Sequence, residues 1–317
     1  MIVYDTKRWW TTLAKLIFGL NSSYNSRVLY KGMLLVTLYT SAITFAKKTY
    51  FPKDKLIESP LIFSILGLIL GLILVFRLNT AYNKWWEGRM KWGSLVNDSR
   101  TLASYLHTLL PKDDKETRTY YAAQISNFAK ALRGHLRDDI KYDEFEYKDE
   151  KYLDTLKEAP HVPHKIATLL MEWMQTSFKR DYISGFDKVN IKVQIQNFID
   201  ILGACERIKN TPIPFSHSSF IKAFITIYVI TLPLGIIDSF PEIYLVIPAT
   251  VLISYALIGV EIISEEIEDP FGTESNDLPL THLSNIIKKN VYDALEVSYD
   301  KEISSLKSED KFIKVLN

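Results

Sequence analysis

Two short polar segments of the chain each begin where a long apolar segment ends. The segment EEIEDPFGTESNDLPL at residues 265–280 follows the apolar residues 243–260, and FRLNTAYNKWWEGR at residues 76–89 follows the apolar residues 59–76. Proline and glycine determine where a backbone turns, and ionisable side chains beside a membrane span usually belong to a functional site. The sequence therefore predicts two specialised charged segments, each at the end of a membrane span.

Signatures of metal binding and of catalysis are weak in this chain. We expect the proline between His161 and His164 to prevent a regular helix there, and no cysteine or carboxylate partner has ligand spacing to them. The HExxH, GxSxG and Walker patterns do not occur in the sequence. We therefore expect no bound metal, no cofactor and no enzymatic activity.

Composition narrows the class of protein further. The 317 residues include 38 basic and 37 acidic side chains, and the formal net charge of +1 gives no bulk field that would attract nucleic acid. The single cysteine, Cys205, excludes an intrachain disulfide, and we expect it to be a small buried apolar residue. Aromatic residues make up 13% of the chain, and many flank apolar segments, as in the interfacial belts of membrane proteins.

Four apolar segments are candidates for membrane spans. A span needs about 20 apolar residues, with a range of about 17–25. The second and fourth segments reach this length, whereas the first and third require flanking lysines that reach the interface or neighbouring helices that shield them. The alternative, buried helices of a large soluble protein, is disfavoured because the segments form two hairpin-like pairs. The four segments are residues 32–46, 59–76, 223–237 and 243–260.

The linkers between these segments predict how the chain crosses the membrane. Residues 47–58 and 238–242 form short loops, whereas residues 80–210 form a long polar insert. The short loops should lie on one side of the membrane, and both termini and the insert on the other. Basic residues near the N-terminus indicate that the side with the termini is the cytosol. Residues 1–21 do not read as a signal peptide, since two tryptophans stand where its apolar region would begin. We expect a multi-pass protein of the plasma membrane.

Helical periodicity recurs along the polar insert. Apolar residues repeat at intervals of three, four and seven, which predicts helices at 95–110, 120–136, 166–178 and 189–208, with the charge run 143–151 as a solvated loop. The expected fold class is therefore all-α, with four transmembrane helices and a helical cytosolic region. The predicted divisions are a cytosolic N-terminal segment 1–28, transmembrane helices 29–78, a cytosolic helical region 79–217, transmembrane helices 218–263, and a cytosolic clasp and C-terminal segment 264–317.

Three sequence blocks together resemble the bestrophin family in its bacterial branch. They are FRxNxAYxxWWEGR from Phe76, RIxxTPIP from Arg207 and EDPFG from Glu268, and the opening YDTKRWW at residues 4–10 fits as well. Each block is moderately specific alone, but their order and spacing agree over about residues 1–290. The resemblance implies a homopentameric ion channel around a central pore, in the inner membrane of a bacterium.

The resemblance also implies where such a pore would narrow. Counting back from the two tryptophans of the first block gives a hydrophobic neck at Leu68, Leu72 and Phe76, called the neck residues below. They fall four apart, so one face of a helix presents all three. The sequence alone would read this stripe as a packing face. A second, cytosolic constriction would fall near Phe186 by ungapped counting.

By the same resemblance, the segment after the fourth apolar segment would form a clasp at the subunit junction. Calcium-gated animal bestrophins have a longer acidic run after this turn; here residues 273–277 are poorer in carboxylates, so we expect no calcium, although the carboxylates could offer oxygens. His217 stands where the family usually has a tyrosine. The histidine would either replace the tyrosine as a simple hydrogen-bonding group or, when protonated, tune gating. The residues of this clasp segment are Glu266, Asp269, Pro270, Phe271, Gly272, Glu274 and Asp277.

The function expected from these features is passive permeation of small monovalent ions, gated by wetting of the neck. Chloride is the family default, since aromatic edges carry partial positive charge, but this neck keeps only Phe76 and leaves cation permeation open. The alternatives are a non-channel membrane scaffold with a helical cytosolic interaction domain and an integral membrane enzyme. The expected partners are further copies of the chain, membrane lipid and small inorganic ions, but no nucleic acid.

Overall fold

The computed structural model describes residues 2–4, 24–51, 61–146, 150–274, 276–298 and 314–316. Most of the expected N-terminal segment, including the stretch that does not read as a signal peptide, lies outside the described residues, as does most of the loop 47–58. The chain divides into two compact units, which are described separately. The span unit contains residues 4–85, 212–269 and 316–317, and the α4 unit contains residues 1–3, 86–211 and 270–315.

The span unit consists of apolar helices, and each of the four apolar segments is helical where the structure describes it. Among the described residues, four helices are long and apolar enough to cross a membrane, at residues 28–50, 61–109, 215–239 and 243–268. The second is a single 49-residue helix, α3, of which the part up to Trp85 belongs to this unit. The elements are α2 (Tyr24–Tyr50), α3 (Leu61–Leu109), α8 (Phe215–Ile236), η3 (Ile237–Ser239), η4 (Ile243–Leu245) and α9 (Val246–Glu268).

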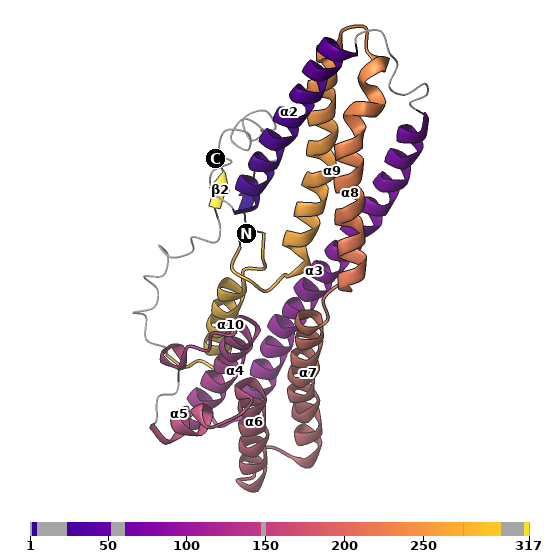
Figure 1. Cartoon of the computed structure of the whole chain (residues 1–317). Helices are drawn as coiled ribbons and strands as arrows, with labels where there is room; N and C mark the ends of the chain where they lie inside the picture. Colours follow the sequence, from indigo (N-terminus) through magenta and orange to yellow (C-terminus); the bar gives the residue numbers. More distant parts are fainter. Residues whose placement is uncertain are drawn as a thin grey trace. The chain divides into compact units, whose positions relative to one another are not determined.

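Close helix packing holds the span unit together. Helix α9 packs against both α2 and α8, as Figure 1 shows, and an apolar core joins α8 to the first half of α3. Two glycines permit this approach: a Cβ on Gly67 would lie 2.5 Å from the Tyr228 hydroxyl, and one on Gly235 would lie 2.3 Å from the Phe63 ring. The Tyr228 hydroxyl donates to the carbonyl oxygen of Phe63 at 3.2 Å. Small residues that let helices approach are typical of membrane packing.

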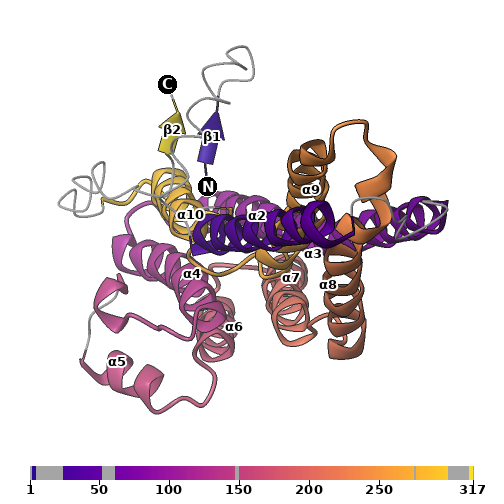
Figure 2. The same cartoon turned by 45° about the horizontal axis from the view of Figure 1, so that its top comes forward.

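The α4 unit is a helical assembly around one nearly buried helix. Helix α4 packs against α6, α7 and α10, and α5 packs on α6, an arrangement visible in Figure 2. Outside the helices, two three-residue strands, β1 (Ile2–Tyr4) and β2 (Lys314–Leu316), pair as a small sheet. The helices of this unit, besides the end of α3, are α4 (Lys115–Leu136), η2 (Tyr142–Glu144), α5 (Glu150–Lys157), α6 (Val162–Lys179), α7 (Gly185–Asn210) and α10 (Leu280–Ala294).

Arg118, in the first turn of α4, terminates helix α3. Its buried guanidinium donates to the carbonyl oxygens of Leu110 at 2.8 Å, His107 at 3.0 Å and Leu295 at 3.1 Å, while Nε donates to that of Pro111 at 3.0 Å. The last carbonyls of a helix have no intrahelical partner and carry partial negative charge. One arginine therefore caps the end of α3 and ties it to the end of α10.

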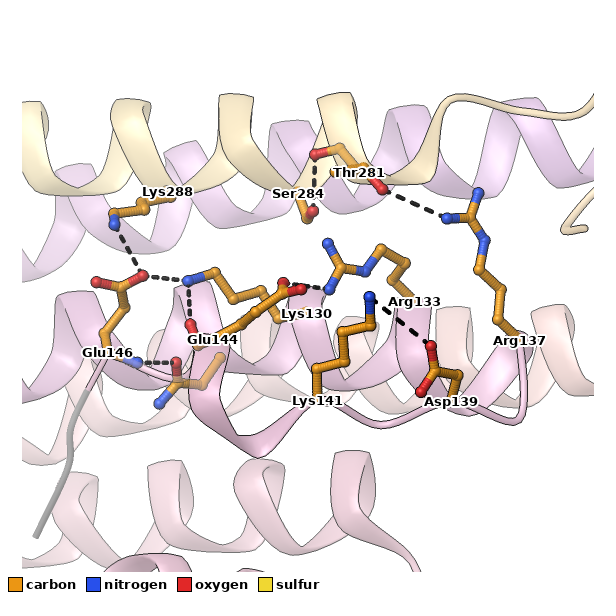
Figure 3. Close-up of polar contacts among 11 residues, drawn as sticks. Lys130, Arg133, Arg137, Asp139, Lys141, Glu144, Glu146, Thr281, Ser284 and Lys288 are labelled. Atoms are coloured by element: carbon orange, nitrogen blue, oxygen red, sulfur yellow. Dashed lines mark hydrogen bonds and ion pairs between the residues drawn. The ribbon is translucent and has the colours of Figure 1, made fainter. Parts of the chain in front are cut away.

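The charge run 143–151 was expected to be a solvated loop, and for its described first part this prediction is wrong. Glu146 pairs with Lys130 of α4 and, at 2.8 Å, with Lys288 of α10, and Glu144 pairs with Arg133 (Figure 3). Although burial alone would raise the pKa of Glu146, the two lysines hold that pKa below the usual glutamate value. Lysines buried inside the unit require a charged partner, and the loop supplies it.

Candidate functional site

The neck residues lie on one exposed, apolar face of α3. The side chains of Leu68, Leu72 and Phe76 are 78%, 58% and 62% exposed in the single chain. Leu70 and Leu74, on the other side of the same helix, are buried in the core against α8. Within the chain, this part of α3 therefore packs through a different face from the one that carries the neck residues. The neck assignment itself stays a prediction.

Directly after the neck residues, Arg77 is buried among the helices of the span unit. Its Nη2 donates to Glu268 Oε2 at 2.7 Å, and its Nε lies 3.7 Å from Glu261 Oε2. The other oxygen of Glu268 accepts from the backbone N–H of Ile213 at 2.8 Å. A buried arginine is costly unless it is paired, so these carboxylates compensate its charge. Arg77 and Glu268 belong to two separate sequence blocks, and their pairing was not predicted from the sequence.

The part of the clasp segment that belongs to the α4 unit is a tight turn against α3. Pro270 and Phe271 are buried, and a Cβ on Gly88 would lie 3.1–3.3 Å from both rings, so the glycine lets the turn pack tightly on the helix. The Arg137 Nε at the end of α4 donates to the Phe271 carbonyl oxygen at 3.1 Å. Gly88 comes from the first sequence block and Phe271 from the third, and the fold joins them.

The carboxylates of the clasp segment have different environments. Asp277 is buried and accepts a hydrogen bond from the backbone N–H of Glu274 at 2.6 Å, while its own N–H donates to the Glu274 carbonyl oxygen at 3.3 Å. The Asp277 carboxylate therefore closes the turn after Gly272. Glu266 and Asp269 belong to the end of α9 in the span unit, where Asp269 is the C-cap.

The residue of the predicted second constriction lies at the start of α7. Phe186 is 87% exposed, in the first turn after a capping box formed by Ser184 and Asp187. Val189 and Val193 follow it at helical spacing and are exposed as well. This apolar stripe distinguishes α7 from a helix that faces only water.

Cys205 behaves as the sequence predicts. Its thiol is buried in α7 and free, and burial raises its pKa to about 12. A thiol with such a pKa stays protonated at neutral pH and is a poor nucleophile and ligand. His217 lies in the first turn of α8, where its N–H donates to the Pro214 carbonyl oxygen at 3.0 Å.

One cluster of possible metal ligands in the α4 unit was not predicted from the sequence. His161 is hydrogen-bonded to Glu206, which also contacts His135. The expectation that the proline prevents a regular helix here is wrong, because α6 begins at Val162 with the proline in its first turn, where the missing N–H has no cost. Glu206 lies 45 residues further along the chain, so spacing within a motif gave no signal for it.

Taken together, the four apolar helices and the helical unit with internal ion pairs define a helical membrane protein. The family model described as bacterial/fungal bestrophin protein matches residues 1–293. The chain belongs to this bestrophin family, as the three sequence blocks indicated.

Known relatives agree with this assignment over nearly their full length. A voltage-dependent anion channel-forming protein of Nostoc sp. is 31% identical over 298 residues, which cover 92% of this chain and 94% of that protein. The voltage-dependent anion channel-forming protein YneE of Escherichia coli K12 is 30% identical over 305 residues, 96% of each chain. A crystal structure of a bacterial bestrophin homologue from Klebsiella pneumoniae has the same fold, with a TM-score of 0.78 over 84% of this chain and 98% of that one, at 24% identity.

Proposed function

We propose that five copies of this chain form a channel that passes small monovalent anions, with chloride as the default ion, passively across a bacterial inner membrane. In this assembly the α3 helices surround a central pore, and the neck residues form its narrowest apolar part. The observation that carries the proposal is the open apolar face of α3 at Leu68, Leu72 and Phe76 in a chain of the bestrophin family. An apolar constriction gates by losing its water.

The charges of α3 support anions over cations. From Leu61 to Trp86 the helix carries the basic residues Arg77 and Lys84 and no acidic residue. The charge of Arg77 is compensated by Glu268 and Glu261, so it does not add a full positive charge to the path. A neck without carboxylates offers cations no replacement for their hydration, whereas the ring edges of Phe76 carry partial positive charge.

The remaining predicted features fit the same assembly. We place residues 29–78 and 218–263 in the membrane, and both termini and residues 79–217 in the cytosol, where rings of Phe186 would narrow the path again. The exposed stripe on α7 supports this role for Phe186. The clasp segment would act at the junction between neighbouring subunits, with its turn held in shape by Asp277 and Arg137.

Reversal potentials of the purified protein in planar bilayers test this proposal. Under a KCl gradient we expect the current to reverse near the chloride equilibrium potential. Reversal near the potassium equilibrium potential would contradict anion selectivity but not the channel. Native mass spectrometry in mild detergent should show a pentamer, and a monomer or dimer alone would reject the assembly. Liposomes without any ion flux would instead favour a membrane scaffold.

A further inference from the structure

Three side chains that are far apart in the sequence converge within the α4 unit. His135 lies in the last turn of α4, His161 is the N-cap of α6, and Glu206 lies near the end of α7. The Nε2 atoms of both histidines lie 2.7 Å from the same oxygen of Glu206, Oε1. All three potential ligand atoms lie within 4.8 Å of one another. Because α6 packs against both α4 and α7, the fold itself holds these groups together.

From this convergence we infer that His135, His161 and Glu206 bind a divalent transition metal ion, for which zinc is the best fit. Two imidazole nitrogens and one carboxylate oxygen are a donor set that zinc accepts, with water in a fourth position. Bonds of about 2.0–2.2 Å in a tetrahedral arrangement place ligand atoms roughly 3.3 Å apart. The two 2.7 Å contacts must therefore lengthen by roughly half an ångström, which side-chain rotation can provide.

The surroundings of the three side chains leave an ion free to enter. The side chains of His135, His161 and Glu206 are 31%, 33% and 29% exposed. The two positive charges nearest along α7 are paired, Arg207 with Glu87 and Lys209 with Asp138 at 2.7 Å, and so oppose a cation less.

Binding at His161 has a structural cost that is small. The ring nitrogen Nδ1 of His161 accepts the capping hydrogen bond from the backbone N–H of His164 at 3.4 Å, so the neutral ring carries its proton on Nε2. An ion at Nε2 moves this proton to Nδ1 and removes the cap, but a contact of 3.4 Å is near the limit of a hydrogen bond. In return the ion links three helices, and a ligand that binds only the folded state stabilises it.

Zinc titration of the full-length protein tests the inference. The detergent-purified protein, with any histidine tag removed, is treated with chelator and titrated with ZnCl2 by calorimetry, in parallel with thermal melts. We expect one zinc ion per chain and a higher melting temperature with zinc. Loss of a hydrogen-bond partner of a metal ligand costs about 10–100-fold in metal affinity, so replacing a ligand itself should weaken binding at least tenfold. The variants are Glu206→Gln, His135→Asn and His161→Asn, in which asparagine can still cap α6.

The matched control is His164→Asn, which changes an exposed histidine beside the cluster and should leave zinc binding unchanged. Melts without zinc separate loss of the site from loss of the fold, because Glu206→Gln keeps the size of the side chain. The inference is overturned if the parent protein binds no zinc. It is also overturned if Glu206→Gln, folded without zinc, binds the ion as tightly as the parent, or if His164→Asn alone abolishes binding.

Discussion

The span unit and the α4 unit distribute their side chains in opposite ways. In the span unit, leucines and a phenylalanine of α3 are exposed while Arg77 is buried among carboxylates. In the α4 unit, exposed positions are mostly polar, but the central helix buries Arg118, Lys130 and Arg133. Each buried cation has partners: backbone carbonyls for Arg118 and carboxylates for the other two.

This contrast shows that the solvent outside each unit, and not burial alone, explains which side chains face outward. Apolar exposure has little cost where lipid, a partner subunit or a pore neck that loses its water replaces bulk water, so α3 can present an apolar face outward. Buried charge has a cost in both units and is compensated by a specific partner in both. Matched substitutions in the two units should therefore have different effects on stability and conductance.

The largest effect is expected from Arg118→Met in the α4 unit. Methionine keeps the length of the side chain but leaves the carbonyl oxygens of His107, Leu110 and Leu295 without their donor. We expect a loss of about 3–5 kcal/mol of stability, since each orphaned buried acceptor costs about 1–3 kcal/mol. Thermal melts in detergent measure it, with the exposed Arg100→Met as the control. Equal melting temperatures of the two variants would contradict the capping role.

In the span unit, Leu72→Ala should raise conductance without changing ion sign. Truncation widens the apolar ring and removes apolar surface worth about 25 cal/mol per Å² in its preference against water. A barrier lower by about 1.4 kcal/mol corresponds to a rate about tenfold higher, which is the scale we expect in single-channel recordings.

The matched control for Leu72→Ala is the same substitution at Leu70, on the other side of the helix. Leu70 is buried against α8, so Leu70→Ala should lower stability by about 2–5 kcal/mol and leave the conductance of surviving channels unchanged. If Leu72→Ala instead lowers the melting temperature at parental conductance, Leu72 is a packing residue and the neck assignment is wrong.

A smaller, pH-dependent effect is expected from Glu146→Gln. The folded-state pKa of Glu146 lies below the usual value, so its carboxylate stabilises the fold above the usual glutamate pKa of about 4.3. This contribution disappears as the pH falls through the lowered folded pKa. The melting temperature of the parent should therefore exceed that of Glu146→Gln at pH 7 and approach it in acid, at roughly 2–4 °C per kcal/mol. A gap that stays constant with pH, or that the exposed Glu150→Gln reproduces, would reject the ion-pair explanation.

The smallest effect is expected from Cys205→Ser. The thiol is buried, and its pKa of about 12 leaves it protonated, so the channel should conduct like the parent and need no reductant. A maleimide reagent should label the native protein slowly and the unfolded protein fully. Loss of conductance in an assembled variant would show that the thiol has a functional role.

The sequence by itself was enough to predict the four apolar helices, the helical insert and the family. Apolar segments such as 59–76 and 243–260 carry their own signal, because lipid requires a continuous apolar surface and internally paired backbone groups. The blocks at Phe76, Arg207 and Glu268 carried the family resemblance, since their residue types and order are local properties of the chain.

Only the tertiary structure decided which polar side chains meet. Arg77 and Glu268 are 191 residues apart, His135 and Glu206 are 71 apart, and the charge run supplies Glu146 to lysines on two helices. Motif spacing reports neighbours on one helix or in one turn, whereas these pairs depend on which helix faces pack together. A buried charge can be compensated by any suitably placed partner, so the sequence requires that a partner exists but leaves its identity to the packing.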